Sequence, residues 1–167
     1  MRRMTSKARQ SAARTTKAST PRTVEAPKRG ILEQLLGYQI RRAQTRLFAH
    51  FEEQLEHLKI TPGQLGLLVL ISANPGINQV ALARAVGIER ATLGEFINRF
   101  ERDKLVERRG LIGDRRSYAL HLTKRGQEFM DQAIPAVLAH ESAFTDHLTS
   151  AERATLLKLL AKLADRP

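Results

Sequence analysis

The chain has no cysteine and no long uninterrupted apolar run. Without cysteine, the protein has no disulfides, no thiolate metal sites and no thiol-based redox sensing. No stretch approaches the roughly 20 consecutive apolar residues that a membrane-spanning helix needs. The N-terminal segment lacks the apolar core of a secretory signal, so we expect a cytoplasmic protein without membrane association.

Signatures of catalysis are missing as well. The chain has no Gly-x-Ser-x-Gly, no phosphate-binding loop and no dinucleotide fingerprint. Two histidine pairs, His50 with His57 and His140 with His147, are each spaced seven residues apart on predicted helices. Each pair therefore lies on one face about 10 Å apart, too far for one metal ion without further ligands. We expect no enzyme, no cofactor and no metal site, and we interpret the histidines as interface or surface residues.

What the chain has in excess is positive charge. It carries 28 Lys and Arg against 17 Asp and Glu, a formal net charge of +11 and a pI of about 10.8. Such a balance favours a polyanionic partner. Residues 1–29 alone contribute +8 and the remaining residues only +3. Any DNA contact of the folded part therefore depends on where individual charges are placed.

Residues 1–30 are rich in Ser, Thr, Ala and Arg and nearly lack large apolar side chains. Such a segment buries too little surface to offset its chain entropy, so we predict a disordered basic N-terminal arm. The interpretation we favour is an arm that adds phosphate contacts. An organellar transit peptide, and a misassigned start or neutral tail, are the alternatives.

The segments on either side of the central region follow a helical period. Apolar residues from Ile31 to Leu58 recur every three or four residues and predict one long helix. Its apolar stripe is wide, which favours a subunit interface over a core helix of a monomer. Thr123 is predicted to cap a further helix that Pro135 kinks or splits. The Thr149–Glu152 spacing predicts a capping box before the last helix.

The central region has the pattern of a helix-turn-helix. Thr61-Pro62 and Asn78 predict two helix starts, and Gly87 a tight turn before a third helix over 89–104. The outer face of this third helix is short-chained and polar near its start, as a helix that reads the major groove requires. Alone it would suit an ordinary amphipathic helix, but its neighbours favour DNA binding. The predicted DNA-contacting residues are Arg90, Ala91, Thr92, Glu95, Asn98 and Arg99.

After this helix the period changes to that of strands. Residues 106–109 and 117–122 predict a hairpin, with Arg115 and Arg116 at or near its tip. Arginine at a hairpin tip can enter a narrow minor groove, and Asp114 can hold an arginine in position. The predicted fold is mainly α with a small β-hairpin wing. It consists of a winged helix-turn-helix domain over 61–123 and a helical dimerisation region over 31–60 and 124–167.

The order of elements over residues 31–165 resembles the MarR family of winged-helix transcriptional regulators. The most specific segment is residues 105–126, LVERRGLIGDRRSYALHLTKRG. It resembles the family's wing, in which an Asp-Arg-Arg tip (Asp114, Arg115, Arg116) precedes a strand and a Leu-Thr-x-x-Gly helix start. The chain departs from the family at Gly94 and Glu95, where hydroxyls and a cation are common, and at Lys104, where glycine is common.

The resemblance implies a homodimer in which the N- and C-terminal helices interlock. Each subunit then presents one reading helix to one half of a pseudo-palindromic duplex, about one helical turn apart. Family members commonly repress transcription and release DNA when a small, often aromatic, acid binds between the two regions. A ligand that favours another lobe spacing shifts the dimer away from its DNA-competent state.

The chain is also similar to family members that govern aromatic-acid catabolism of the hydroxycinnamate type, some of which sense acyl-CoA thioesters. Several polar residues of the first helix are then candidates for an effector site. The arginines among them suit an anionic aromatic or acyl-CoA ligand. The candidates are Tyr38, Arg41, Arg42, Gln44, Arg46 and His50.

Two other functions compete with a ligand-responsive repressor. An architectural DNA-binding protein would bind duplexes without sequence preference and without an effector. An enzyme subunit that uses a winged helix as a protein-interaction surface would bind no duplex.

Overall fold

The computed structural model describes residues 27–111 and 114–165, and the side chains of residues 111–117 lie outside that description. Short 3-10 helices over Gly30–Gln34 and Glu56–Leu58 flank the first α-helix. The helices are α1 (Leu36–Leu55), α2 (Pro62–Ala73), α3 (Gln79–Val86), α4 (Arg90–Arg102), α5 (Lys124–Phe144) and α6 (Ser150–Ala164). The strands are β1 (Ile77–Asn78), β2 (Val106–Leu111) and β3 (Asp114–Leu122).

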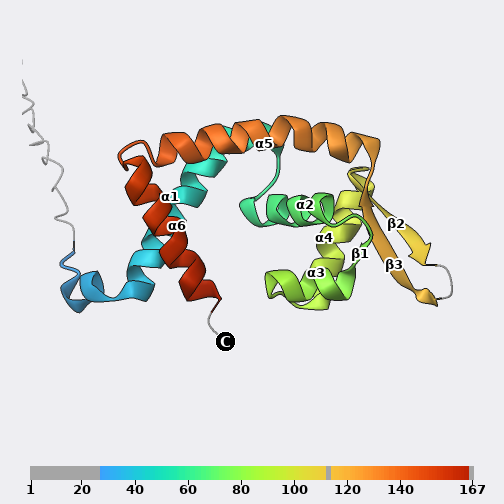
Figure 1. Ribbon diagram of the computed structural model, residues 1–167, viewed down its shortest axis with the longest axis horizontal. Coiled ribbons are helices and arrows are strands. Elements are labelled where there is room, and N and C mark those ends of the chain that lie inside the picture. Colours follow the sequence, from blue (N-terminus) through green and yellow to red (C-terminus); the bar gives the residue numbers. More distant parts are fainter. Residues whose placement is uncertain (1–26, 112–113, 166–167) are drawn as a thin grey trace, which may run out of the picture.

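Helix α5 connects two differently built parts of the molecule (Figure 1). At one end it lies with α1 and α6, and α1 packs along it. At the other end it joins a lobe made of α2, α3, α4 and the three strands. Within the described residues, no helix is both long and apolar enough to cross a membrane.

Side-chain caps start four of the helices where the sequence predicts them. Thr61 and Thr149 each form a capping box, with Gln64 and Glu152 respectively. The Asn78 side chain accepts from the Ala81 amide, and the Thr123 hydroxyl accepts from the Gly126 amide. These caps satisfy backbone amides that have no partner within the helix, so the starts of α2, α3, α5 and α6 are set locally.

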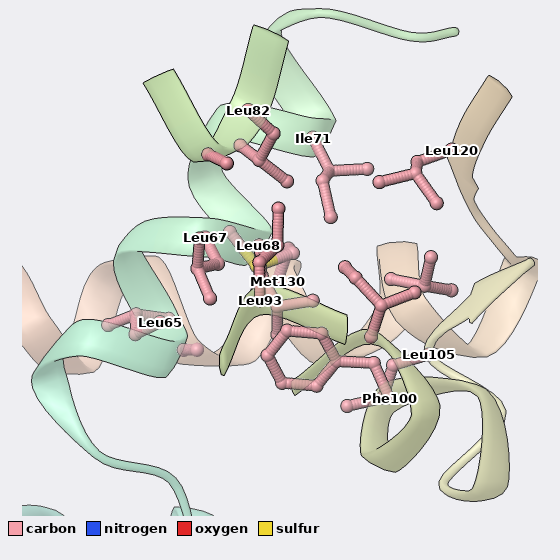
Figure 2. Close-up of a cluster of buried hydrophobic side chains, with 14 of the residues drawn as sticks. Leu65, Leu67, Leu68, Ile71, Leu82, Leu93, Phe100, Leu105, Leu120 and Met130 are labelled. Carbon is pink, nitrogen blue, oxygen red and sulfur yellow. The ribbon is translucent and has the colours of Figure 1, made fainter. Parts of the chain in front are cut away.

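The core of the lobe is a cluster of buried apolar side chains that includes the ring of Phe100 (Figure 2). Leu68 and Ile71 of α2, Leu82 of α3 and Leu93 of α4 are fully buried there. The strands form an antiparallel sheet in the order β1-β3-β2. These side chains fix the orientation of α4, because its apolar face has only one place to pack. The remaining large, fully buried side chains are Ile97, Phe100 and Leu120.

A tight junction joins α4, the sheet and α5. Lys104 adopts a left-handed conformation with φ of 58°, and Leu105 behind it is buried. The Thr123 hydroxyl donates to the Lys104 carbonyl at 2.5 Å. A Cβ on Gly126 would lie 2.0 Å from the Leu105 carbonyl oxygen, so only glycine fits this approach. The Leu-Thr-x-x-Gly pattern thus holds the wing against the end of α4.

The predicted fold class is confirmed, with three differences in detail. The first helix is interrupted, because Leu35 is extended between the Gly30–Gln34 turn and α1. Helix α5 runs without interruption from Lys124 to Phe144, so the predicted split at Pro135 does not occur. Strand β1 was not predicted, because two residues carry too little alternation to be recognised.

Candidate functional site

The outer face of α4 is the first candidate surface. Leu93 and Ile97 are buried against the lobe, and the predicted contact residues on the other side of the helix are exposed. Because the side chains near the start of that face, such as Ala91 and Thr92, are short, the helix backbone itself can approach a partner closely. The exposed residues are Arg90, Ala91, Thr92, Glu95 and Asn98.

Asn98 is held by Arg108, a residue that the sequence analysis did not predict to be part of the site. Arg108 of β2 donates from Nη2 to the Asn98 Oδ1 at 2.9 Å, and its Nη1 donates to the Glu101 carboxylate. Arg108 therefore links the wing to the exposed polar face of α4. With Oδ1 accepting from a guanidinium, the Asn98 side chain offers its amide NH₂ as a hydrogen-bond donor. No local pattern indicates this contact, since it depends on the approach of β2 to α4.

Arg99 lies apart from the other predicted contact residues. Its Nη2 donates to the Lys59 carbonyl at 3.3 Å, and its Nε lies 3.8 Å from the Asp103 carboxylate. There it lines a hollow of about 650 Å³ formed by the loop before α2, the end of α4 and the start of α5. In this arrangement its guanidinium is engaged within the lobe.

The wing is formed by β2 and β3, which pair in antiparallel register from Val106 opposite Leu122 to Gly110 opposite Tyr118. The register shifts between Gly110 and Leu111. The tip residues 112–113, and the side chains of Asp114, Arg115 and Arg116, lie outside the described part of the structure. The roles of these three residues therefore remain predictions from the sequence.

A second candidate site is a hollow of about 260 Å³ where α1, α2 and α5 meet. It lies between the helical end of the molecule and the lobe, and its walls are mainly apolar. Pockets that bind small molecules have this composition, with a few polar groups that fix orientation. Its lining includes Phe48 and Phe51 of α1, Leu65 and Val69 of α2, and His140 and Glu141 of α5.

Two histidines meet beside this hollow. The rings of His50 and His140 lie 4.8 Å apart between centroids, and Phe51 and Phe144 pack around His140. His140 is 4% exposed, and its ring nitrogens make no hydrogen bond of good geometry, nor does Nδ1 of His50. Burial lowers the pKa of His140, His50 lowers it further, and Glu141 and the nearby Leu47 carbonyl oppose the shift. The uncharged form of His140 is therefore favoured.

Of the six predicted effector residues, only His50 lies next to the hollow. Arg42 is placed over the Tyr38 ring, 5.8 Å from its centroid, and donates to Gln39. Arg41, Gln44 and Arg46 are exposed on α1. The sequence interpretation of the histidines as surface or interface residues is wrong for His140, which is buried and meets His50 because α5 packs along α1. The hollow itself was missed, because its walls come from segments far apart in the chain.

Helices α2, α3 and α4 follow one another, α4 has an exposed polar face, and the β2–β3 hairpin packs on α4. This arrangement defines a winged helix-turn-helix protein. The match to a family model agrees with this class: residues 60–118 match the MarR family. A Thauera aromatica protein named for the transcriptional regulation of the hcr operon is 36% identical over 129 residues, which cover 77% of this chain and 78% of that protein. The chain belongs to the MarR family.

Two solved structures extend the similarity to the whole fold. The repressor CouR bound to a 23-mer DNA duplex matches with a TM-score of 0.80 at 36% identity, covering 84% of this chain and 99% of CouR. CouR bound to p-coumaroyl-CoA matches with a TM-score of 0.76 at 35% identity, again covering 84% of this chain and 99% of CouR.

Proposed function

We propose that this protein is a ligand-responsive, sequence-specific transcriptional repressor that acts as a homodimer on a pseudo-palindromic operator. The observation that carries the proposal is the exposed polar face of α4 beside the wing, in a fold shared with a repressor solved on a DNA duplex. In this proposal α4 reads base edges in the major groove, and Arg115 and Arg116 of the wing contact the backbone and minor groove.

The dimer is inferred from apolar surface at the helical end. Helix α6 has no buried residue, and Leu156, Leu159, Leu160 and Leu163 are between 41% and 53% exposed on one side of it. Ile31 and Leu36, before and at the start of α1, are more than half exposed. A stripe of leucines that long needs a partner to be stable in water. A second copy of the chain supplies the same stripe, so residues 31–60 and 124–167 form the dimerisation region.

The effector site we favour is the hollow between α1, α2 and α5, not the larger one beside Arg99. Its walls are apolar, and it lies where the dimerisation region joins the DNA-binding lobe of residues 61–123. A ligand that fits this hollow in only one lobe position shifts the dimer toward that position. The effector is an aromatic acid or its CoA thioester, and the CouR complex with p-coumaroyl-CoA supports this class.

Binding-site selection from random duplexes tests the proposal. We expect a two-fold symmetric consensus whose half-sites are separated by about one helical turn. Adding aromatic acids and their CoA esters to the selected complex should release the DNA. Enrichment of no consensus would favour the architectural alternative, and failure to bind any duplex would favour a protein-interaction role.

A further inference from the structure

Arg108 is a charged residue on the face of the sheet that packs against the lobe. In the β2–β3 pairing it lies opposite Leu120, which is fully buried, and residues directly opposite each other share one face of a sheet. Its neighbours Glu107 and Arg109 form an ion pair with each other on the other face. The Arg108 side chain is only 25% exposed. An arginine in such a place needs partners, since burying an unpaired charge costs free energy.

Helix α4 supplies both partners from residues about one helical turn apart. The Arg108 guanidinium donates to the Glu101 carboxylate and to the Asn98 Oδ1, the latter at 2.9 Å. A guanidinium has donors only, so the Asn98 atom that it contacts is the amide oxygen and not the nitrogen. The contact therefore sets both the position and the orientation of the Asn98 amide.

This orientation decides what Asn98 offers to a partner. Asn98 is exposed on the polar face of α4, and its NH₂ group carries two donors. Its oxygen already accepts from a cation, which repels the hydrogen of a second donor and makes the oxygen a poorer acceptor. Asn98 with Arg108 behind it is therefore mainly a hydrogen-bond donor.

The bases differ in what they present to a donor in the major groove. Guanine presents two acceptors, O6 and N7, and no donor. Adenine presents one acceptor and the N6 donor, so an asparagine that reads adenine uses its oxygen and its nitrogen together. Thymine presents one acceptor beside a methyl group, and cytosine presents the N4 donor. An asparagine whose oxygen is held by a guanidinium matches guanine best and loses the two-bond contact with adenine.

We propose that Arg108 sets the base specificity of Asn98, so that Asn98 reads guanine and not adenine. Arg108 is a positioning residue, because it acts through Asn98, and Glu101 holds its guanidinium from the other side. The inference rests on the proposed function, in which the exposed face of α4 reads base edges. It adds which base that helix selects at one position of each half-site.

Binding-site selection with the full-length protein, followed by duplex titrations, tests the inference. The position that Asn98 reads is the one at which Asn98→Ala loses its base preference. There we expect the wild-type protein to bind guanine about fivefold more tightly than adenine. Arg108→Ala releases the Asn98 oxygen for adenine, and this ratio should fall to about one or below. A wild-type preference for adenine, or an unchanged ratio in Arg108→Ala, would overturn the inference.

Three further variants separate specificity from folding. Asn98→Asp keeps an acceptor for Arg108 but removes the donors, so the preference should change from guanine to cytosine, whose N4 donates. Arg109→Ala is the matched control, because it removes the same charge from the other face of the same strand and should leave the ratio unchanged. If Arg108→Ala does not fold, Arg108→Met retains the unbranched stem without its donors and should give the same fall in the ratio.

The outcomes separate this inference from the proposed function. A two-fold symmetric consensus at which neither Asn98→Ala nor Arg108→Ala changes any base preference would leave the repressor function standing and overturn the inference. Selection of no consensus by the wild-type protein would overturn both.

Discussion

The winged lobe and the helical end of the molecule use the same apolar pattern with opposite results. In the lobe, Leu68, Ile71 and Leu93 are completely buried within one chain. In α6, leucines at the same helical spacing remain about half exposed. The difference teaches that the lobe folds on contacts of its own chain, whereas the apolar surface of the helical end is left open in one chain, where we propose that a second copy covers it.

The largest expected effect is a loss of folding stability in the lobe. Gly126→Ala places a methyl group 2.0 Å from the Leu105 carbonyl, so either the start of α5 or the end of α4 must move. We expect a loss of about 3 kcal/mol in the free energy of unfolding, at the upper end of overpacking costs. Thermal unfolding followed by circular dichroism measures it. Gly37→Ala in α1 has nothing within 4 Å of the new methyl and should leave the melting temperature within a degree or two.

The next largest effect is expected from a substitution that disrupts the proposed dimer contact of the helical end and leaves the lobe folded. Leu160→Glu puts a charge into the exposed leucine stripe of α6 and should give a monomer. DNA affinity should then fall about a hundredfold, because the two half-sites are no longer bound together. Light scattering and duplex titration measure both quantities. Lys158→Glu lies off the stripe of the same helix and should remain dimeric; a monomer there, or a dimer for Leu160→Glu, would contradict the assignment.

A smaller effect tests the wing. Arg116→Ala should weaken DNA binding across sequences and reduce the slope of log affinity against log salt by about one unit. Arg115→Ala should act in the same direction. Duplex titrations from low salt to about 0.15 M measure the slope. Intact affinity at the higher salt would show that the wing does not contact DNA.

Deletion of residues 1–29 probes the basic segment that precedes the fold. Because it carries a net charge of +8, its removal should flatten the salt dependence. The ratio of affinities for selected and random duplexes should stay nearly constant. A collapse of that ratio would mean that the segment reads sequence.

The polar face of α4, which we propose reads bases, gives a test with a smaller expected effect. Arg108→Ala removes the hydrogen bond to the Asn98 side-chain oxygen. We expect the preference among bases at the position contacted by Asn98 to change by about 1 kcal/mol in binding free energy. Asn98→Ala should remove the preference at that position. Binding-site selection with each variant compares them, and an unchanged consensus in both would exclude Asn98 from base reading.

Local features of the fold were predictable from the sequence. Caps such as Thr61, Asn78 and Thr149 act over three residues, and the buried face of α4 follows from one helical period. Position 104, where the family commonly has glycine, was informative as well, because Lys104 has a left-handed backbone conformation in the structure. These features need no knowledge of the rest of the chain.

The parts that were missed depend on the approach of distant segments. His50 and His140 are 90 residues apart, and nothing in either neighbourhood indicates that their rings meet. The same holds for Arg108 with Asn98 and for Arg99 with the Lys59 carbonyl. A polar side chain on a helix surface has several partners within reach, and tertiary packing decides among them.

The smallest expected effect is a gain in folding stability at the left-handed residue Lys104 of the lobe. Lys104→Gly removes a side chain from a left-handed residue and should stabilise the fold by up to about 1 kcal/mol. Chemical denaturation measures the gain. A loss of stability would show that the Lys104 side chain contributes more than its backbone conformation costs.

The central claim is that two chains share one duplex through the leucine stripe of α6. Sedimentation equilibrium of the full chain, alone and with its selected duplex, tests it most directly. The account predicts twice the mass of one chain in the free protein and two chains on each two-fold symmetric duplex. A single chain that binds its duplex with full affinity would contradict it.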